Sequence, residues 1–315
     1  MKRILLADTL HESFTELIRN AGMEPVHGHH LSAEQVLEII DGYDGMAIRS
    51  RFPINQAFIS KASRLRCIGR AGAGMENIDM KAATAAGITC VNAPEGNRTA
   101  VAEHALGMLL MLMNHLGRAD EEVRQGIWKR EENRGTELEG KTVGIIGFGN
   151  MGSAFARRLS GFGVQVLALD PYVRIDKSTF PYVDQCSLDD IKKNADIISL
   201  HLPLNEETRY MVNDEFIAQL HKRVVLINTA RGRNVDTASL VRGLESGKIA
   251  GAALDVLEYE SLSFEKLDTS ALPDPFRYLI GSAKVVLSPH IAGWTHESNE
   301  KIARILAEKM IAVLI

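Results

Sequence analysis

Short apolar runs alternate with segments of helical periodicity along most of the chain. RILLAD (residues 3–8), DGMAIRS (44–50) and RLRCIGRAGAG (64–74) each contain an apolar run of strand length, and the last leads into a glycine-rich loop. HESFTELIRNAG (11–22) lies between two of these runs, has the spacing of an amphipathic helix and ends in Gly22. Alternation of strand and helix patterns predicts an α/β fold in which crossover helices join parallel strands.

A second series of the same kind begins at Lys141. We expect its strands in the segments KTVGII, VQVLALD, ADIISL, VVLIN, IAGAALDV and KVVLS. Polar, glycine or proline residues follow each of these runs. Because the carboxyl ends of parallel strands meet at one edge of a sheet, where open α/β sheets bind ligands, these residues can share a crevice. The two series predict two Rossmann-like units.

A strand that ends at Pro94 and a long helix are expected where the first series meets the second. The strand lies in AAGITCVNAP (85–94), and the helix runs from about Ala100 to Gly117. The most apolar part of this helix, ALGMLLMLMNHL (105–116), is far shorter than the roughly 20 residues that span a bilayer. It is typical of a buried or interface helix.

Composition narrows the class of protein. The 315 residues suit one large or two medium domains, and the hydrophobic content of 45% with 24% charged residues is that of a globular protein. A net charge of −4 gives no reason to expect nucleic acid or an anionic membrane as a partner. Three isolated cysteines suggest a reducing compartment, and Asp8 interrupts the first apolar run too early for a signal peptide. We therefore expect a cytoplasmic protein.

The segment GFGNMG has the spacing of a dinucleotide-binding turn. Gly147, Gly149 and Gly152 follow an expected strand and precede an expected helix, and Asp170 lies 23 residues after Gly147; the pattern requires an acid after roughly 20. The glycines would permit a tight turn, close approach of a pyrophosphate and helix packing. Asp170 would accept hydrogen bonds from the adenosine ribose and repel a 2′-phosphate, so NAD is favoured over NADP.

Three further residues follow expected strands of the same series: Arg231 in INTARG, Glu260 in LDVLEYES and His290 in SPHIAG. Each alone also suits a structural role, as an ion-pair partner, a loop acid or a surface histidine. Their joint position at one sheet edge beside a dinucleotide site favours catalysis. An arginine there can grip an anionic substrate, and a histidine can transfer a proton.

These motifs together resemble the D-2-hydroxyacid dehydrogenases. The resemblance rests on GFGNMG with DPY, HLPLNEET, INTARG, GAALDVLEYE and SPHIAG, and upstream on RAGAGMENID and NAPEGNRTAVAEHALGMLL. It implies that an NAD-binding Rossmann domain (97–288) is inserted into a flavodoxin-like substrate domain (1–96 and 289–315). It also implies NAD-dependent hydride transfer, with Arg231 on the substrate carboxylate, His290 as acid and base, and Glu260 favouring the imidazolium.

The resemblance implies roles for further residues. The backbone around Ala73 and Gly74 would bind the substrate carboxylate, and Asp255 would face the nicotinamide. The remaining positions that match cofactor-lining residues are Asn150, Met151, His201, Pro203, Thr208, Thr229 and Ala230. No metal site is expected, because HGHH (27–30) lacks partners at ligand spacing. A homodimer is expected from the Met-rich helix 105–116 and from the family's habit.

The substrate is the most open question. Arg49 and Arg51 in IRSRF resemble the arginines of phosphoglycerate dehydrogenases, which places 3-phosphoglycerate slightly ahead of glyoxylate or hydroxypyruvate and of D-lactate. A non-enzymatic NAD-sensing protein on the same fold stays an alternative, and a formate-dehydrogenase-like enzyme is disfavoured because Glu260 is not glutamine. Ser261 replaces the family's usual proline, and an enlarged segment extends to residue 284.

Overall fold

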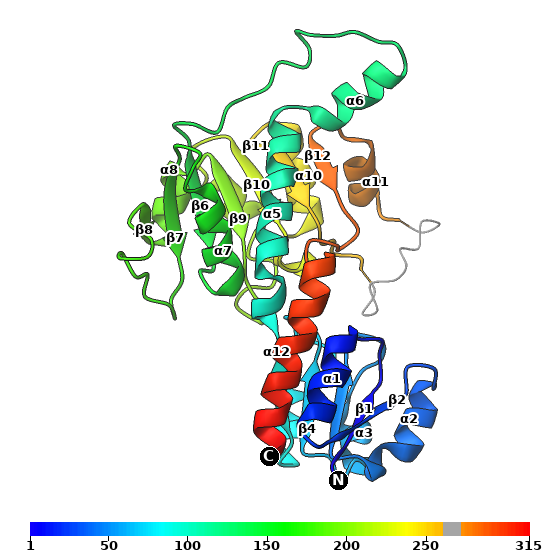
Figure 1. Cartoon of the computed structure of the whole chain (residues 1–315). Helices are drawn as coiled ribbons and strands as arrows, with labels where there is room; N and C mark the ends of the chain where they lie inside the picture. Colours follow the sequence, from blue (N-terminus) through cyan, green and yellow to red (C-terminus); the bar gives the residue numbers. More distant parts are fainter. Residues whose placement is uncertain (261–271) are drawn as a thin grey trace. The chain divides into compact units, whose positions relative to one another are not determined.

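The structure is a computed structural model of the chain, and it describes residues 1–260 and 272–315. These residues form two compact units (Figure 1). We call residues 1–98 and 294–315 the N-terminal unit, and the rest, 99–260 and 272–293, the central unit. The units change a few residues later than the predicted domain boundaries at 96 and 288. Ser261 and the first part of the enlarged segment, up to residue 271, lie outside the described residues.

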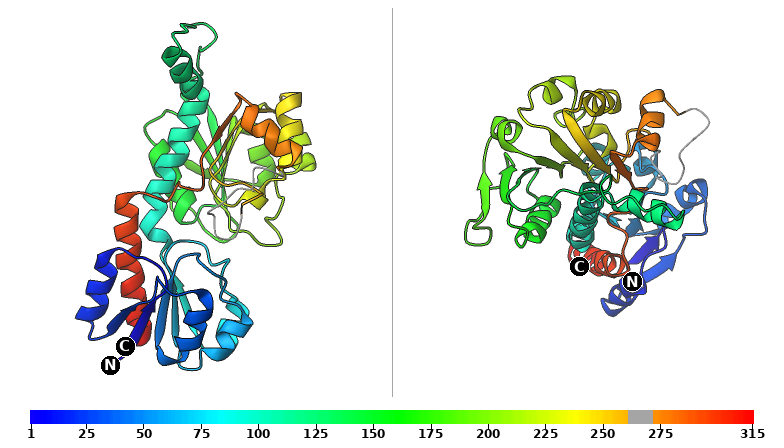
Figure 2. Two further views of the ribbon diagram at one scale, coloured as in Figure 1. Left: turned by 90° about the vertical axis from the view of Figure 1, so that its right-hand side faces the viewer. Right: turned by 90° about the horizontal axis from the view of Figure 1, so that it is seen from above.

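The N-terminal unit contains a five-stranded parallel sheet with the strand order β2-β1-β3-β4-β5. Its strands are β1 Arg3–Leu6, β2 Glu24–His27, β3 Gly45–Ile48, β4 Cys67–Arg70 and β5 Thr89–Asn92. Its helices are α1 Glu12–Asn20, α2 Ala33–Ile39, α3 Gln56–Lys61, α4 Met80–Ala85 and α12 His296–Leu314. Helices α1 and α12 lie side by side on one face (Figure 2). The buried cluster around Met46 and Phe58 fills the other face.

The central unit contains a seven-stranded parallel sheet with the order β12-β11-β10-β9-β6-β7-β8. Its strands are β6 Thr142–Ile146, β7 Gln165–Leu169, β8 Val183–Gln185, β9 Ile197–Leu200, β10 Val224–Asn228, β11 Ile249–Leu254 and β12 Val285–Leu287. Its helices are α5 Pro94–Met113, which starts in the N-terminal unit, α6 Leu116–Arg124, α7 Asn150–Leu159, α8 Leu188–Asn194, α9 Asp214–Ala218, α10 Thr237–Ser246 and α11 Asp274–Gly281.

Both faces of this sheet are buried, which explains its continuous apolar strands. Residues of α5 and α7 pack on one face, and residues of α8, α9, α10 and α11 pack on the other (Figure 1). Ile145 faces the first cluster and its neighbour Ile146 the second, as alternation along a strand requires. The predicted α/β class with two parallel-sheet domains is confirmed.

The sequence prediction misplaced some elements. Helix α5 begins at Pro94 rather than near Ala100, because proline suits the first helical position, where no N–H is needed. It ends at Met113, and His115 has a left-handed backbone (φ 54°) before α6 begins. The short edge strands β2 and β8 were not predicted. Strand β2 contains Pro25, which is tolerated at a sheet edge.

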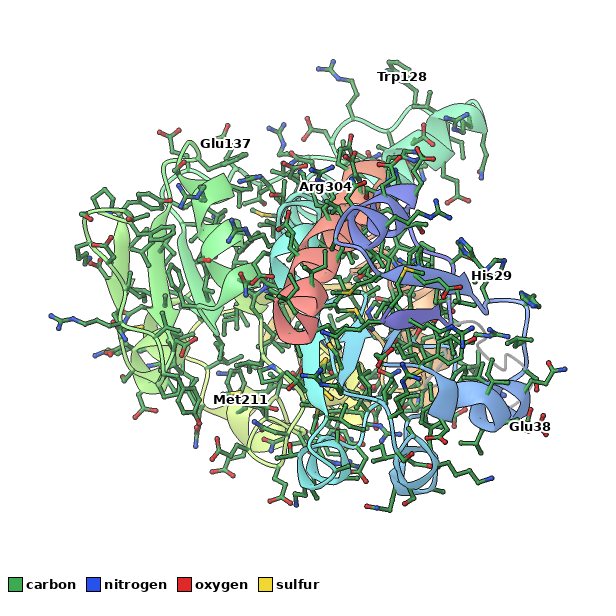
Figure 3. The ribbon with its side chains drawn as sticks, turned by 60° about the horizontal axis from the view of Figure 1, so that its bottom comes forward. His29, Glu38, Trp128, Glu137, Met211 and Arg304 are labelled. Carbon is green, nitrogen blue, oxygen red and sulfur yellow. The ribbon has the colours of Figure 1, made fainter. Side chains whose placement is uncertain are left out.

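The sequence predicted neither a metal site nor a membrane-spanning helix, and the described residues can be searched for both. His27 ends β2, and His29 and His30 beyond it are exposed; Figure 3 shows His29. Among the residues that the structure describes, no group of histidine, cysteine and acidic side chains is arranged to hold a metal ion. Within the same residues, no helix combines the length and the apolar character needed to cross a membrane.

Candidate active site

The glycine turn between β6 and α7 is packed tightly at its two ends and open in the middle. Gly147 has a φ of +92°, and a Cβ there would lie 2.3 Å from the carbonyl oxygen of His201. A Cβ on Gly152 would lie 1.9 Å from the carbonyl oxygen of Gly147. No atom lies within 4 Å of a Cβ built on Gly149. The turn therefore needs glycine at its ends for its own geometry, while Gly149 and the first turn of α7, with Asn150 and Met151, leave room for a phosphate group.

Asp170 is fixed beside this turn, just after β7. Its Oδ2 accepts a hydrogen bond from the N–H of Phe148 (2.7 Å), and its Oδ1 accepts from the N–H groups of Tyr172 (2.8 Å) and Val173 (3.0 Å). Each carboxylate oxygen has two lone pairs, so these bonds orient Asp170 and leave one lone pair, on Oδ2, to accept a hydrogen bond from a ribose hydroxyl.

Two of the predicted cofactor-lining residues carry buried polar atoms that lack a hydrogen-bond partner within the described chain. These atoms are Nδ1 of His201 and Oγ1 of Thr229. His201 follows β9; its Nε2 contacts Oγ of Ser199 (2.8 Å), and burial lowers the pKa of its ring to about 3. The imidazole is therefore neutral near pH 7. Buried polar atoms are normally paired, so these two fit a site that a polar ligand completes, as NAD would.

The other predicted cofactor residues mainly shape loops. Thr208 Oγ1 donates to the carbonyl oxygen of Pro203 (2.6 Å) and accepts from the N–H of Asn205 (3.0 Å). Ala230 is buried after β10, and its N–H donates to Oδ1 of Asn228 (3.0 Å). Their direct contact with the cofactor stays a prediction.

Arg231 follows the same strand at a short 3₁₀ turn, Gly232–Asn234. Its N–H donates to Oδ1 of Asn234 (3.0 Å), and its Nη1 donates to the carbonyl oxygen of Ala230 (2.6 Å). A Cβ on Gly232 would lie 2.0 Å from the carbonyl oxygen of Leu257. Because Gly232 has no side chain, the turn that carries Arg231 packs directly against the segment that leads to Glu260.

Glu260 and His290 form a close pair. Oε2 of Glu260 lies 2.8 Å from Nδ1 of His290, and Oε1 accepts a hydrogen bond from the N–H of Leu257. The two side chains are 15% and 26% exposed. Because the carboxylate holds Nδ1, the other ring nitrogen, Nε2, is the one that can serve a substrate. Arg231, Glu260 and His290 follow β10, β11 and β12, which are neighbours in the sheet.

Asp255 occupies the centre of the loop that carries His290. It is 1% exposed, and its carboxylate accepts hydrogen bonds from Oγ of Ser288 (2.6 Å) and from the N–H groups of Ile291 and Ala292 (both 2.9 Å). Burial alone would raise the pKa of Asp255, but the nearby His104 ring, the Ser288 hydroxyl and the N–H groups of the loop together outweigh burial and lower the pKa. The predicted contact with nicotinamide stays a prediction.

In the N-terminal unit, the two predicted substrate arginines differ. Arg51 donates from Nη1 to the carbonyl oxygen of Ala7 (2.9 Å) and from Nη2 to that of Leu31. The Arg49 guanidinium instead stacks on the ring of Trp294, 4.8 Å from its centroid, while Asp8 accepts from the Arg49 N–H (2.6 Å). Burial lowers the pKa of Arg49, against the attraction of Asp8. Backbone carbonyl oxygens thus hold the Arg51 side chain in place, and the contact of either arginine with a substrate stays a prediction.

The glycine loop after β4 carries the predicted backbone donors. Within the described residues, the N–H groups of Ala73 and Gly74 donate to no backbone carbonyl. Nδ2 of Asn92 holds the loop by donating to the carbonyl oxygen of Ala73 (2.5 Å). Both N–H groups are thus compatible with the predicted role toward a carboxylate.

Sequence reasoning missed four residues that shape these sites: His104, Gly232, Ser288 and Trp294. A polar residue within the apolar helix segment AEHALGMLL was the available signal for His104. Ser288 and Trp294 lie close to His290 in SPHIAGW, but nothing in the sequence alone specifies their partners.

The chain is similar to known proteins over almost its whole length. Residues 106–292 match the family model "D-isomer specific 2-hydroxyacid dehydrogenase, NAD binding domain". A hydroxypyruvate reductase of Thermotoga maritima is 36% identical, covering 99% of this chain and 98% of the relative. A D-3-phosphoglycerate dehydrogenase of Archaeoglobus fulgidus is 34% identical and covers 98% of this chain, which spans only 56% of that relative.

Two solved structures of dehydrogenases superpose on this chain over nearly its whole length. D-Lactate dehydrogenase from Aquifex aeolicus, complexed with NAD and lactic acid, superposes with a TM-score of 0.84 at 28% identity, covering 99% of this chain and 95% of the other. D-2-Hydroxyisocaproate dehydrogenase superposes with a TM-score of 0.83 at 29% identity, covering 99% and 96%.

Proposed function

The chain belongs to the D-isomer-specific 2-hydroxyacid dehydrogenases, NAD-dependent oxidoreductases, and from this premise we propose that it reduces a small 2-oxo acid with an uncharged tail. Hydroxypyruvate and glyoxylate are the substrates that we place first. One observation supports the catalytic role above all: Glu260 and His290 lie 2.8 Å apart. They follow strands β11 and β12, next to strand β10, which Arg231 follows.

The residues of the central unit divide the chemistry between them. Arg231 presents a planar, always charged fork, which suits a carboxylate and the adjacent carbonyl oxygen and thereby orients the ketone. His290, with Nδ1 held by Glu260, delivers a proton from Nε2 to the oxygen as it gains negative charge. The Glu260 carboxylate stabilises the imidazolium before this transfer. When bound, NADH supplies the hydride. In the oxidative direction His290 takes the proton back.

The choice of an uncharged tail rests on the two arginines. A distal phosphate needs several donors, but Arg51 is engaged with the carbonyl oxygens of Ala7 and Leu31. A hydroxypyruvate reductase that is 36% identical is among the relatives of this chain, which also favours an acid without a phosphate. The second candidate, 3-phosphohydroxypyruvate, is supported by Arg49, whose guanidinium faces Trp294 rather than a carboxylate.

A panel of 2-oxo acids tests the proposal. NADH oxidation is followed with hydroxypyruvate, glyoxylate, pyruvate and 3-phosphohydroxypyruvate, with His290→Asn as the inactive control. We expect hydroxypyruvate or glyoxylate to give the highest kcat/KM. A clear preference for the phosphorylated acid that is lost in Arg49→Ala would establish the second candidate. Binding of NADH without turnover of any acid would point to an NAD-sensing protein instead.

We also propose that the chain forms a homodimer through α6 and the segment that follows it. None of the residues of α6 is buried, and Leu116, Val123 and Trp128 are 54%, 53% and 78% exposed. Figure 3 shows Trp128 beyond the end of this helix. The apolar helix that suggested a dimer in the sequence instead packs Ala105, Leu109 and several neighbours into its own unit's core. Sedimentation should give a dimer mass that falls in Val123→Glu/Trp128→Glu; a wild-type monomer would refute the proposal.

A further inference from the structure

The loop 288–292, which carries His290, is folded around the carboxylate of Asp255. His290 donates its N–H to the carbonyl oxygen of Asp255 (2.8 Å), and the next two N–H groups, of Ile291 and Ala292, donate to the carboxylate (2.9 Å each). His290 has a φ of +55°, in the left-handed region that is unfavourable for a residue with a side chain. Its backbone therefore depends on the surroundings that hold the loop.

His104, on helix α5, is linked to the Asp255 carboxylate through Ser288. Its Nε2 lies 2.9 Å from Oγ of Ser288 and 3.5 Å from Oδ1 of Asp255, and Oγ of Ser288 lies 2.6 Å from the same Oδ1. An ionised carboxylate only accepts hydrogen bonds, so the Ser288 hydroxyl donates to Asp255. The oxygen of Ser288 is then the acceptor for an Nε2–H of His104. All of these residues belong to the central unit.

We infer that His104 is a positioning residue for His290. It acts through Ser288 and Asp255 and touches neither the reacting atoms nor His290 itself. The hydrogen bonds between His104, Ser288 and Asp255 fix the loop backbone. The loop in turn orients the imidazole of His290, whose Nδ1 is held by Glu260. This inference rests on the proposed function, because the alignment matters for proton transfer to a 2-oxo acid.

The first variant is His104→Leu, which replaces the N–H donor by an apolar side chain of similar size. Because small misplacements of a catalytic group are costly, we expect kcat to fall about 10- to 100-fold. The Kd of NADH should change far less. The solvent deuterium isotope effect on kcat should rise, because proton transfer becomes slower relative to the other steps. His104→Gln keeps an N–H donor at similar reach and should restore both kcat and the isotope effect.

Controls separate this role from a loss of folding. Glu103→Gln changes the neighbouring residue on α5, whose carboxylate pairs with Arg158, and should leave kcat unchanged. Ser288→Ala should lower kcat by itself and should abolish most of the further effect of His104→Leu in the double variant. Additive effects of the two substitutions, or an equal loss in His104→Leu and His104→Gln, would overturn the inference.

Hydrogen exchange tests the same network without relying on turnover. Peptides that cover residues 286–293 should exchange faster in His104→Leu than in wild type, and at the wild-type rate in His104→Gln. Should wild type prove inactive on every 2-oxo acid, the proposed function fails, while faster exchange in His104→Leu alone still supports the positioning network. Unchanged exchange in His104→Leu would overturn it.

Discussion

At the scale of single residues, backbone groups decide what the charged side chains can do. Leu257 holds one oxygen of Glu260, so that the other oxygen faces His290. Asp170 is likewise held by three N–H groups beside the glycine turn. A carboxylate held in this way does not need to reorganise when its partner becomes charged or a ligand arrives. Backbone groups engage Arg51 in a different way, because its guanidinium donates hydrogen bonds to the carbonyl oxygens of Ala7 and Leu31.

Glu260→Gln separates the charge of this residue from its shape. The amide oxygen can still accept from the N–H of Leu257, but it cannot stabilise an imidazolium as a carboxylate does. Because general acid catalysis contributes about 10²- to 10⁴-fold, we expect the loss of the charge to lower kcat roughly 10-fold or more. Steady-state kinetics with the best 2-oxo acid measures this.

Glu258→Gln is the matched control for that variant. The Glu258 carboxylate accepts hydrogen bonds from Tyr210 Oη (2.8 Å) and from the N–H of Thr237 (3.1 Å), so it holds loops together. We expect lower stability with nearly unchanged kcat. Equal kcat losses in the two variants would mean that Glu260 has no special role toward His290.

Asp170→Asn should weaken the discrimination between NADH and NADPH. The amide oxygen can keep part of the hydrogen bonding to the turn, while the negative charge that repels a 2′-phosphate disappears. A hydrogen bond to a charged group is worth about 1.5–3 kcal/mol, so we expect NADH to bind roughly 10-fold more weakly and NADPH to bind more tightly. Fluorescence titration with both cofactors measures the ratio. An unchanged ratio would assign the selectivity to other residues.

At the scale of elements, the central strands of both sheets could be predicted from the sequence. The short edge strands β2 and β8 and the break between α5 and α6 could not. The strands around Gly45–Ile48 and Val224–Asn228 are buried on both faces, so their apolar runs identify them. Strand β2 spans only Glu24–His27 at an edge, and few apolar residues are needed there. The three catalytic candidates were found because strand ends converge in a parallel sheet. The support of His290 by His104 depends on tertiary packing, which local patterns do not encode.

The contact between β6 and α7 supplies a prediction at this scale. A methyl group on Gly152 would lie 1.9 Å from the carbonyl oxygen of Gly147, a backbone atom that cannot move aside. Gly152→Ala should therefore displace the start of α7, with a loss of about 1–3 kcal/mol in the free energy of unfolding, as for other overpacked sites, and weaker NADH binding. Urea denaturation and fluorescence titration check both effects.

Gly161→Ala is the control at the other end of the same helix. No atom lies within 4 Å of a Cβ built there, so stability and NADH binding should stay close to wild type. If Gly152→Ala behaved in the same way, the close approach of α7 to the turn would not matter for the site.

At the scale of the whole molecule, each unit contains its own parallel sheet and its own core, and among the described residues the chain passes from one unit to the other after Arg98 and after Gly293. Helix α5 carries the first passage. Its first turn is fixed within the N-terminal unit, where Glu95 pairs with Lys309 of α12 (2.9 Å) and Gly96 leaves no room for a Cβ against the backbone of Ile302. Later residues of α5 belong to the core of the central unit. One continuous helix thus contributes packing contacts to both units.

The stability of the whole chain should fall on acidification partly because of His201. Burial lowers the pKa of its ring to about 3, whereas an unfolded chain has a histidine pKa of about 6.5. Between these values the unfolded chain binds the proton and the folded chain does not, so the free energy of unfolding decreases as the pH falls. One pH unit corresponds to about 1.4 kcal/mol.

Since His201 is partly exposed, we expect its contribution between pH 6.5 and 4.5 to be about 1–2 kcal/mol. His201→Gln cannot titrate and should lose correspondingly less stability over this range. Asp255 is not a source of this difference, because its pKa is lowered and its stabilising effect is therefore lost only below the carboxyl's ordinary pKa of about 4. Urea denaturation at both pH values compares wild type with His201→Gln. Parallel losses in the two proteins would mean that the ring of His201 accepts a proton in the folded state.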